Sequence, residues 1–167
     1  MSFKSENELE QFSFENCEVV DVTQKEDKLD FKLEALIVRP RNSQNANYTE
    51  SYADTATLSL FNPEIIEAFK EGYKLYDAND NVKEEIPDVE LATAEIQELL
   101  YKKAKGMYLA DVVCDEKTPN SSQYTFFFEE PPTEEYGEDL RSDSYMVRIS
   151  FEKSVICWER YLNRVER

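Results

Sequence analysis

The chain has 167 residues, with 36 acidic and 19 basic side chains, a net charge of −17 and a calculated pI near 4.4. Such a field repels nucleic-acid phosphates and anionic membrane surfaces, so it argues against nucleic acid and membrane as partners. The length is typical of one domain, and 41% hydrophobic residues suffice for a core, which excludes global disorder. We therefore expect a single folded domain over residues 1–167.

The absence of histidine excludes several kinds of site. Without an imidazole there is no Ser-His-Asp triad, no Cys-His dyad and no histidine metal site. Cys17, Cys114 and Cys157 are odd in number and far apart, unlike a disulfide framework or a zinc site. We expect no cofactor and no metal, and the sequence favours a protein that is not an enzyme. The opening residues lack the apolar stretch of a signal peptide, so we expect a cytoplasmic protein.

The chain opens with a predicted helical turn and a predicted hairpin. Residues 5–12 can form one or two turns of helix, because Ser5 can cap them and Glu8 is the matching capping-box residue. Between residues 17 and 38, two strand-like runs flank a charged turn, and in the second run apolar and polar side chains alternate. This pattern predicts an antiparallel hairpin with one buried face.

The next part of the chain contains a loop, a strand and an ambiguous segment. Residues 40–51 are polar and predict a loop, and residues 52–61 predict a strand. Asn62 and Gly72 are placed to start and end a short helix, but the segment between them also fits a turn followed by a strand. We favour the strand for 62–72, because it continues a meander of sequential strands.

The strongest helix signal covers about residues 91–105. Thr93 is a suitable N-cap, apolar side chains recur at helical spacing, and lysines gather in the last turn. Gly106 is well placed to end the helix.

Three further strand patterns follow, over residues 107–114, 123–130 and 144–151. Residues 153–166 space apolar side chains by three and four, which predicts an amphipathic helix, and a strand through residues 154–158 is the alternative. Together these patterns predict an α+β fold. Its mostly antiparallel, curved or barrel-like β-meander would have about six to eight strands, one central helix and short terminal helices.

An acidic segment with two prolines, residues 129–139, follows three phenylalanines. Consecutive prolines cannot continue a strand, so a solvated loop has a sufficient structural cause. The functional alternative is a loop that docks a basic protein partner. Its six carboxylates are Glu129, Glu130, Glu134, Glu135, Glu138 and Asp139.

The C-terminal segment has a different composition. Trp158, Arg160, Tyr161 and Arg164 together resemble a protein–protein hot spot. The interpretation that we favour is that Trp158 packs on a sheet while the protein's own acids neutralise the arginines.

Asp54 is a candidate buried acid, because it lies in line with apolar residues on a predicted strand face. A buried carboxylate needs a partner or a raised pKa. We favour a position at the start of the strand, where Asp54 would accept hydrogen bonds from loop 40–51.

Residues 77–81 resemble the opening of a calcium loop. The resemblance fails at Val82, where a glycine is required, and at Asp88, where a bidentate glutamate is required. A turn rich in Asn and Asp is therefore the expected structure.

From charge and exclusion we expect an acidic, non-enzymatic binding module for a basic protein partner, in the manner of small acidic inhibitors or immunity proteins. The alternative is a small-ligand-binding β-barrel or a carboxylate-dependent enzyme, for which a Tyr- and Phe-lined pocket around an acid such as Asp54 would be the sign. A third hypothesis is that the protein is a structural subunit of a larger assembly. The sequence predicts no particular partner, ligand or oligomeric state.

Overall fold

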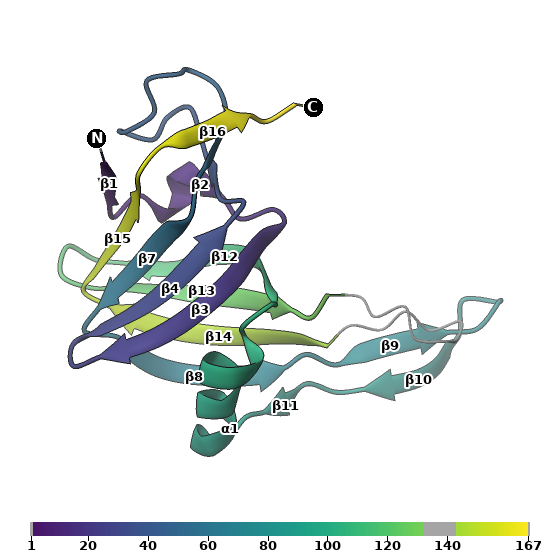
Figure 1. Ribbon diagram of the computed structural model, residues 1–167. Coiled ribbons are helices and arrows are strands. Elements are labelled where there is room, and N and C mark those ends of the chain that lie inside the picture. The colour runs from purple at the N-terminus through teal and green to yellow at the C-terminus, as the bar shows by residue number, and fades with distance from the viewer. Residues whose placement is uncertain (1, 132–142, 167) are drawn as a thin grey trace.

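Antiparallel strands dominate the computed structural model, which describes residues 2–131 and 143–166 (Figure 1). Ten strands form one sheet in the spatial order β1–β15–β7–β4–β3–β12–β13–β14–β8–β11. In that order they span Phe3–Glu6, Lys153–Trp158, Ala56–Phe61, Lys28–Glu34, Cys17–Lys25, Tyr108–Lys117, Ser122–Glu129, Ser144–Phe151, Glu64–Lys70 and Val89–Glu90.

Two smaller sheets and a few helical turns accompany the large sheet. The four-stranded sheet has the order β16–β6–β5–β2, with strands Tyr161–Arg164, Ser51–Ala53, Ile37–Val38 and Phe12–Ser13. The two-stranded sheet pairs β9 (Tyr73–Tyr76) with β10 (Val82–Ile86). The helical segments are the 3-10 turn η1 (Leu9–Gln11), the helix α1 (Thr93–Glu98) and its π-helical continuation η2 (Leu99–Lys103).

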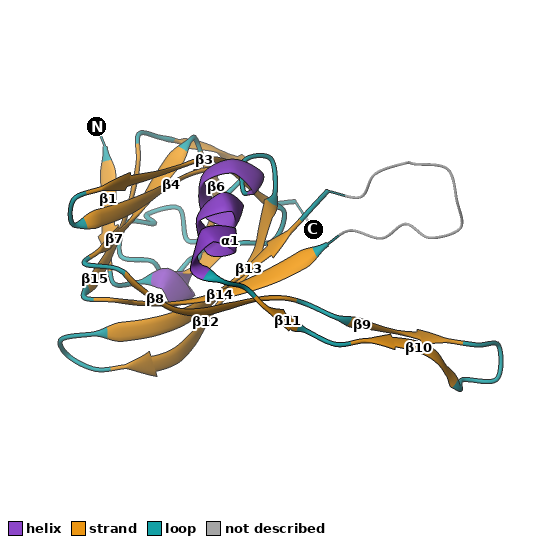
Figure 2. Ribbon diagram, turned by 90° about the horizontal axis from the view of Figure 1, so that it is seen from below, coloured by secondary structure: helices purple, strands orange, loops and turns teal. Residues whose placement is uncertain are grey.

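The large sheet folds back on itself around an aromatic core. β4 and β13 are three steps apart in the sheet order, which is about 14 Å in a flat sheet. Yet Phe31 of β4 stacks on Phe126 and Phe128 of β13, with ring centroids 6.0 and 6.2 Å apart. All three rings are fully buried. The sheet must therefore bend sharply, so that its two halves form opposite walls of one core (Figure 2).

The bend lies where β3 meets β12. These strands pair over only two residues each and then diverge. Beyond that point, Val19 of β3 exchanges backbone hydrogen bonds of 2.8 Å with Gly106 and Met107, the residues that lead from the helix into β12. The helix therefore lies alongside the part of β3 that β12 has left.

The central helix, predicted at 91–105, is confirmed at Thr93–Lys103. Ala92, rather than Thr93, is the N-cap, and its N–H donates to Glu95 Oε1 at 3.1 Å. The chain leaves the helix through Gly106, whose φ of +85° lies in the left-handed region that glycine adopts without strain.

Most of the predicted strands and loops are confirmed. The hairpin expected between residues 17 and 38 is formed by β3 and β4, and residues 62–72 contain the strand β8. Residues 40–50 form the expected loop. The loop is well anchored, because the buried Asn45 amide donates to three backbone carbonyls.

The predicted fold class is wrong. The described residues are 56% strand and 9% helical, with one 11-residue helix, so the fold is mostly β rather than α+β. The ten-stranded sheet is also not closed into a barrel, because β1 and β11 remain at its two ends. Its halves are held together by packed side chains such as Phe31 and Phe126, and among the described residues no strand pairing joins its two edges.

The short terminal helices are wrong as well. At the C-terminus the alternative prediction of a strand is confirmed, because residues 153–158 form β15. Residues 161–164 form a further strand, β16. Val155 and Ile156 favour strand geometry, and pairing with β7 on one side and β1 on the other leaves both side chains buried. Leu162, which the helical spacing would bury, is 57% exposed.

At the N-terminus, residues 3–6 form β1, which pairs with β15, and only Leu9–Gln11 is helical. The Ser5 hydroxyl still donates to the Glu8 carboxylate at 2.8 Å, as the capping-box pattern suggested. The same carboxylate accepts two hydrogen bonds from Ser43 in the loop. Glu8 thus links the N-terminus to loop 40–50 and does not cap a helix.

Candidate functional site

A hairpin arm leaves the body of the molecule after β8 and returns to the large sheet through β11, which pairs with β8. We define the arm as residues 71–90, which contain β9, β10 and β11. Figures 1 and 2 both show β9 and β10 extending away from the two walls of the core. In the described part of the chain, β9 and β10 pair only with each other.

The base of the arm is tightly built. A Cβ atom at Gly72 would lie 1.9 Å from the carbonyl oxygen of Ile86, so only glycine permits this approach. The Gly72 N–H donates to Asp88 Oδ1 at 2.6 Å. Further out, Lys74 lies opposite Glu85, with Nζ 3.7 Å from Oε1. These contacts fix how the hairpin leaves the body.

The arm displays apolar and aromatic side chains among many carboxylates. Tyr76 is 57% exposed, Val82 and Val89 are each 52% exposed, and Tyr73 is 36% exposed. Seven carboxylates and two lysines give the arm a net charge of −5. The carboxylates belong to Glu71, Asp77, Asp80, Glu84, Glu85, Asp88 and Glu90.

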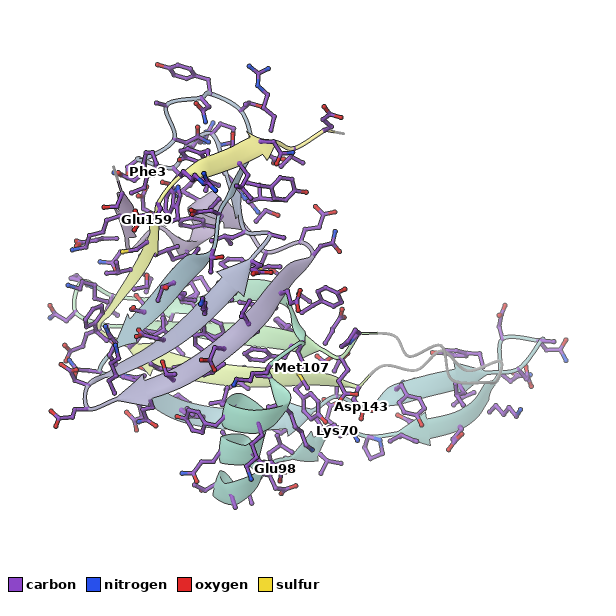
Figure 3. All side chains as sticks on the ribbon, in the orientation of Figure 1. Phe3, Lys70, Glu98, Met107, Asp143 and Glu159 are labelled. Atoms are coloured by element: carbon purple, nitrogen blue, oxygen red, sulfur yellow. The ribbon has the colours of Figure 1, made fainter. Side chains whose placement is uncertain are left out.

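Like charges crowd at the base of the arm. Burial, together with the charges of Asp88 and Glu129, raises the pKa of Glu71 above its ordinary value. Nearby, Lys70 Nζ lies 3.3 Å from Asp143 Oδ2, and this hydrogen bond raises the pKa of Lys70. Figure 3 shows Lys70 and Asp143 beside each other where the arm begins. One lysine therefore faces several carboxylates.

The predicted acidic loop begins next to this base. Glu129 is the last residue of β13, and the Glu130 N–H donates to the Asp143 carbonyl at 2.9 Å. The other four candidates, Glu134, Glu135, Glu138 and Asp139, lie outside the described residues. The described start of the loop and the base of the arm thus form one acidic surface.

The predicted C-terminal patch is divided between core and surface. Trp158 is 2% exposed and stacks on Phe3 at 5.5 Å. Tyr161 contacts Trp158 edge-on at 5.8 Å and donates its hydroxyl to a loop carbonyl. Arg160 and Arg164 are exposed. The aromatic and basic members of this patch therefore do not share one exposed surface.

Asp54 lies in a bend between β6 and β7 and is partly buried. Its carboxylate accepts the Glu159 N–H at 3.1 Å and lies 4.0 Å from Arg160 Nε. It is thus an acceptor at the start of a strand, but its donor comes from the β15–β16 turn and not from loop 40–51. The hollow beside it, about 520 Å³, is lined by Tyr52 and the carboxylates of Glu18 and Glu34. The described residues that line it include no phenylalanine.

The turn at 77–81 is organised by its own side chains. Asp77 Oδ1 accepts the backbone N–H groups of Asn79 and Asn81, at 2.8 and 3.0 Å. Among the described residues, no group of three or more Asp, Glu and Cys side chains is arranged to hold a metal ion. The turn has the structure that its Asn and Asp content predicts.

Sequence reasoning missed Tyr73 and Tyr76 as surface residues. The sequence placed this part of the chain in a meander of sequential strands and did not single out either tyrosine. A signal was present, since β10 carries three successive charged residues, Lys83, Glu84 and Glu85, between Val82 and Ile86. Such a strand has no continuous apolar face to bury against a core.

In the described part of the chain, no helix has the length and apolar character required to cross a membrane. Comparisons with protein-family models, curated proteins and solved structures find no match to this chain.

Proposed function

We propose that the protein is a non-enzymatic binding module that engages a basic protein partner, and that the partner docks on the arm. One observation carries the proposal. The arm projects from the core and exposes Tyr73, Tyr76, Val82 and Val89 among seven carboxylates. Apolar contact area and negative charge are therefore available on the same projecting element.

The tyrosines supply contact area. A two-stranded hairpin is at best marginally stable by itself, so an arm of this kind gains stability when a partner covers its apolar side chains. Tyrosine is enriched among the residues that dominate binding energies. A central tyrosine that a partner buries is worth about 2 kcal/mol, which corresponds to about thirtyfold in affinity.

The carboxylates raise the rate of association with a basic partner and select for positive charge. A concentrated negative surface raises the association rate of a basic protein by about ten- to a thousandfold at low salt, and the effect falls as salt increases. Lysines or arginines of a partner would also relieve the repulsion among Glu71, Asp88 and Glu129. The base of the arm therefore favours a cationic partner in particular.

The test is a pull-down from a lysate of the source organism at low and at high salt, with captured proteins identified by mass spectrometry. Three baits are compared: the wild-type protein, Tyr73→Ser/Tyr76→Ser, and Tyr48→Ser. Tyr48 is 89% exposed in loop 40–50, so its substitution is a matched control.

We expect the wild-type and Tyr48→Ser baits to retain the same basic protein at low salt and to release it at high salt, while the arm variant retains little. Equal retention by all three baits would contradict the proposal that the partner docks on the arm. Retention of no basic protein by the wild-type bait would contradict the proposed function itself.

A further inference from the structure

In the described part of the chain, one edge of β12 lacks a paired strand over most of its length. β12 pairs with β13 from Tyr108 to Lys117 on one side, but with β3 only at Tyr108 and Leu109 on the other. From Ala110 onward, no strand among the described residues lies along this second edge. By contrast, Gly106 and Met107 cover the edge of β3 where the two strands diverge.

The backbone of β12 offers hydrogen-bonding groups at this edge. A β-bulge separates Leu109 from Asp111, and the N–H of the next residue, Val112, donates to Asp111 Oδ1 at 2.8 Å. Backbone groups alternate between the two edges of a strand, so Cys114 presents its N–H and carbonyl on the same side as Val112. A carboxylate of the protein thus takes the place of a neighbouring strand at Val112.

A groove runs along this edge. Its volume is about 430 Å³, and it lies between β12 residues 110–114 and the segment from η1 through β2. Four steps of about 3.3 Å give this part of β12 a length of about 13 Å. Beyond Cys114, Lys117 Nζ lies 3.4 Å from the Asn7 carbonyl oxygen and 3.7 Å from the Glu10 carboxylate. The length along residues 110–114 accommodates a short extended segment.

The lining indicates which side chains such a segment would carry. Ala110, Val112 and the 41% exposed Val113 provide apolar surface above the buried Phe12 and Phe14, while Glu10, Glu15 and Asp111 provide three carboxylates. Among the described residues that line the groove, Arg39 is the one basic side chain. The net charge of the lining is therefore negative, which complements lysine or arginine.

We propose that this groove binds an extended peptide segment of a partner protein, which adds to the sheet as a strand beside β12. The segment displaces the Asp111 carboxylate from the Val112 N–H, pairs with the backbone of Val112 and Cys114, and alternates apolar residues with lysine or arginine. Its N–H and carbonyl groups supply the pairing that β3 provides only at Tyr108 and Leu109. The inference does not rest on the proposed function of the arm, because the groove is formed by different residues.

The test is to pan a phage-displayed library of random decapeptides against the full chain and to map the enriched peptides by amide hydrogen exchange. We expect enriched sequences that alternate apolar residues with Lys or Arg and that slow exchange at Val112 and Cys114. Failure to enrich any peptide, or protection confined to other strands, would overturn the proposal.

Variants make the mapping specific. Cys114→Arg places a long cationic side chain in the groove, and we expect it to weaken the enriched peptides about tenfold or more. Cys157→Arg is the matched control, because Cys157 is also an exposed strand residue but lies outside the groove. Equal affinity of the two variants for the enriched peptides would contradict the proposed site.

A second variant tests the backbone pairing directly. Val112→Pro removes the N–H that faces the groove, at a strand edge where proline is tolerated. We expect about a tenfold loss of peptide affinity from the missing hydrogen bond. If Val112→Pro does not fold, modification of Cys114 by a thiol reagent gives the same information. Bound peptide must slow that reaction and leave Cys157 unaffected, and equal rates with and without peptide would overturn the proposal.

Discussion

The hydroxyl of Tyr124 donates a hydrogen bond to Glu10, with Oη 2.5 Å from Oε1, across 114 residues of sequence. Lys117 Nζ lies 3.7 Å from the same carboxylate oxygen. Burial by itself would raise the pKa of Glu10, but the Tyr124 hydrogen bond and the Lys117 charge outweigh it. The pKa of Glu10 therefore lies below its ordinary value of 4.5, and this contact attaches the N-terminal segment to the β12–β13 hairpin.

Tyr124→Phe should lower the free energy of unfolding by about 1 kcal/mol, or the melting temperature by about 2–4 °C. A carboxylate with a lowered folded-state pKa stabilises the protein above its unfolded-state pKa, and this stabilisation is lost as the pH falls through the folded-state pKa. The difference between wild type and variant should thus be constant from about pH 5 to 7 and shrink below about pH 4. Thermal unfolding across this range measures it. Tyr48→Phe is the control and should change nothing, whereas a difference that persists undiminished at low pH would contradict the role of Glu10.

Glu71→Gln should stabilise the protein at neutral pH. The folded-state pKa of Glu71 is raised, so its ionised form opposes folding above that pKa and has no such effect once the group is protonated. We therefore expect the melting temperature of the variant to exceed that of wild type at pH 7 and to equal it at about pH 4. Glu84→Gln, further along the arm, serves as the control. Destabilisation by Glu71→Gln at pH 7 would show that like charges do not crowd at the base of the arm.

Gly72→Ala should release the arm without unfolding the core. The added Cβ would lie 1.9 Å from the Ile86 carbonyl oxygen, so the segments that contain Gly72 and Ile86 must separate there. We expect amide exchange over residues 73–86 to accelerate about tenfold or more while exchange in β13 and β14 stays unchanged.

The same substitution at Gly106 is the comparison. Nothing lies within 4 Å of a Cβ at Gly106, but its φ is +85°. Gly106→Ala should therefore cost about 1 kcal/mol of overall stability and leave arm exchange slow relative to the core. If both substitutions gave the same exchange pattern, the structure at the base of the arm would not depend on Gly72.

The cysteines should divide into two classes of reactivity. Cys114 and Cys157 are exposed, whereas Cys17 is buried and its pKa is raised to about 12, chiefly by burial and further by Glu18. At pH 8 Cys17 is therefore almost entirely in the unreactive thiol form, so it should not react. Titration with Ellman's reagent should count two thiols in the native protein and three in denaturant. A third fast thiol in the native state would show that Cys17 is accessible.

The sequence allowed the local elements to be predicted. Alternation of apolar and polar residues identified the β3–β4 hairpin, and Gly106 marked the end of the helix. The contact of Phe31 with Phe126 could not be predicted, because nothing local specifies that a sheet will bend until two of its strands face each other. A closed barrel and a folded open sheet have the same alternating pattern in the sequence, so the pattern alone does not distinguish them.

At the C-terminus, Val155, Trp158 and Leu162 have helical spacing, yet Ile156 and Trp158 also fit one face of a strand. Pairing with β7 decides between these structures, and that pairing is a tertiary interaction. The candidate site likewise depends on tertiary structure. The sequence shows that Tyr73 and Tyr76 lie near acidic residues, but only the course of the chain through Gly72 shows that they stand away from the core.

The central claim is that the arm steers and binds a basic partner. The most direct measurement is the association rate of the captured partner as a function of ionic strength, by stopped flow, for three forms of the protein. These are wild type, the arm variant Asp80→Asn/Glu84→Gln/Glu90→Gln, and the control Glu26→Gln/Asp27→Asn/Glu159→Gln, which removes three charges elsewhere.

We predict that the arm variant associates about tenfold more slowly than wild type at low salt, that its rate depends less on salt, and that the control stays close to wild type. Equal rates and equal salt dependence for the arm and control variants would contradict the claim, because the partner would then respond to the total charge and not to the arm.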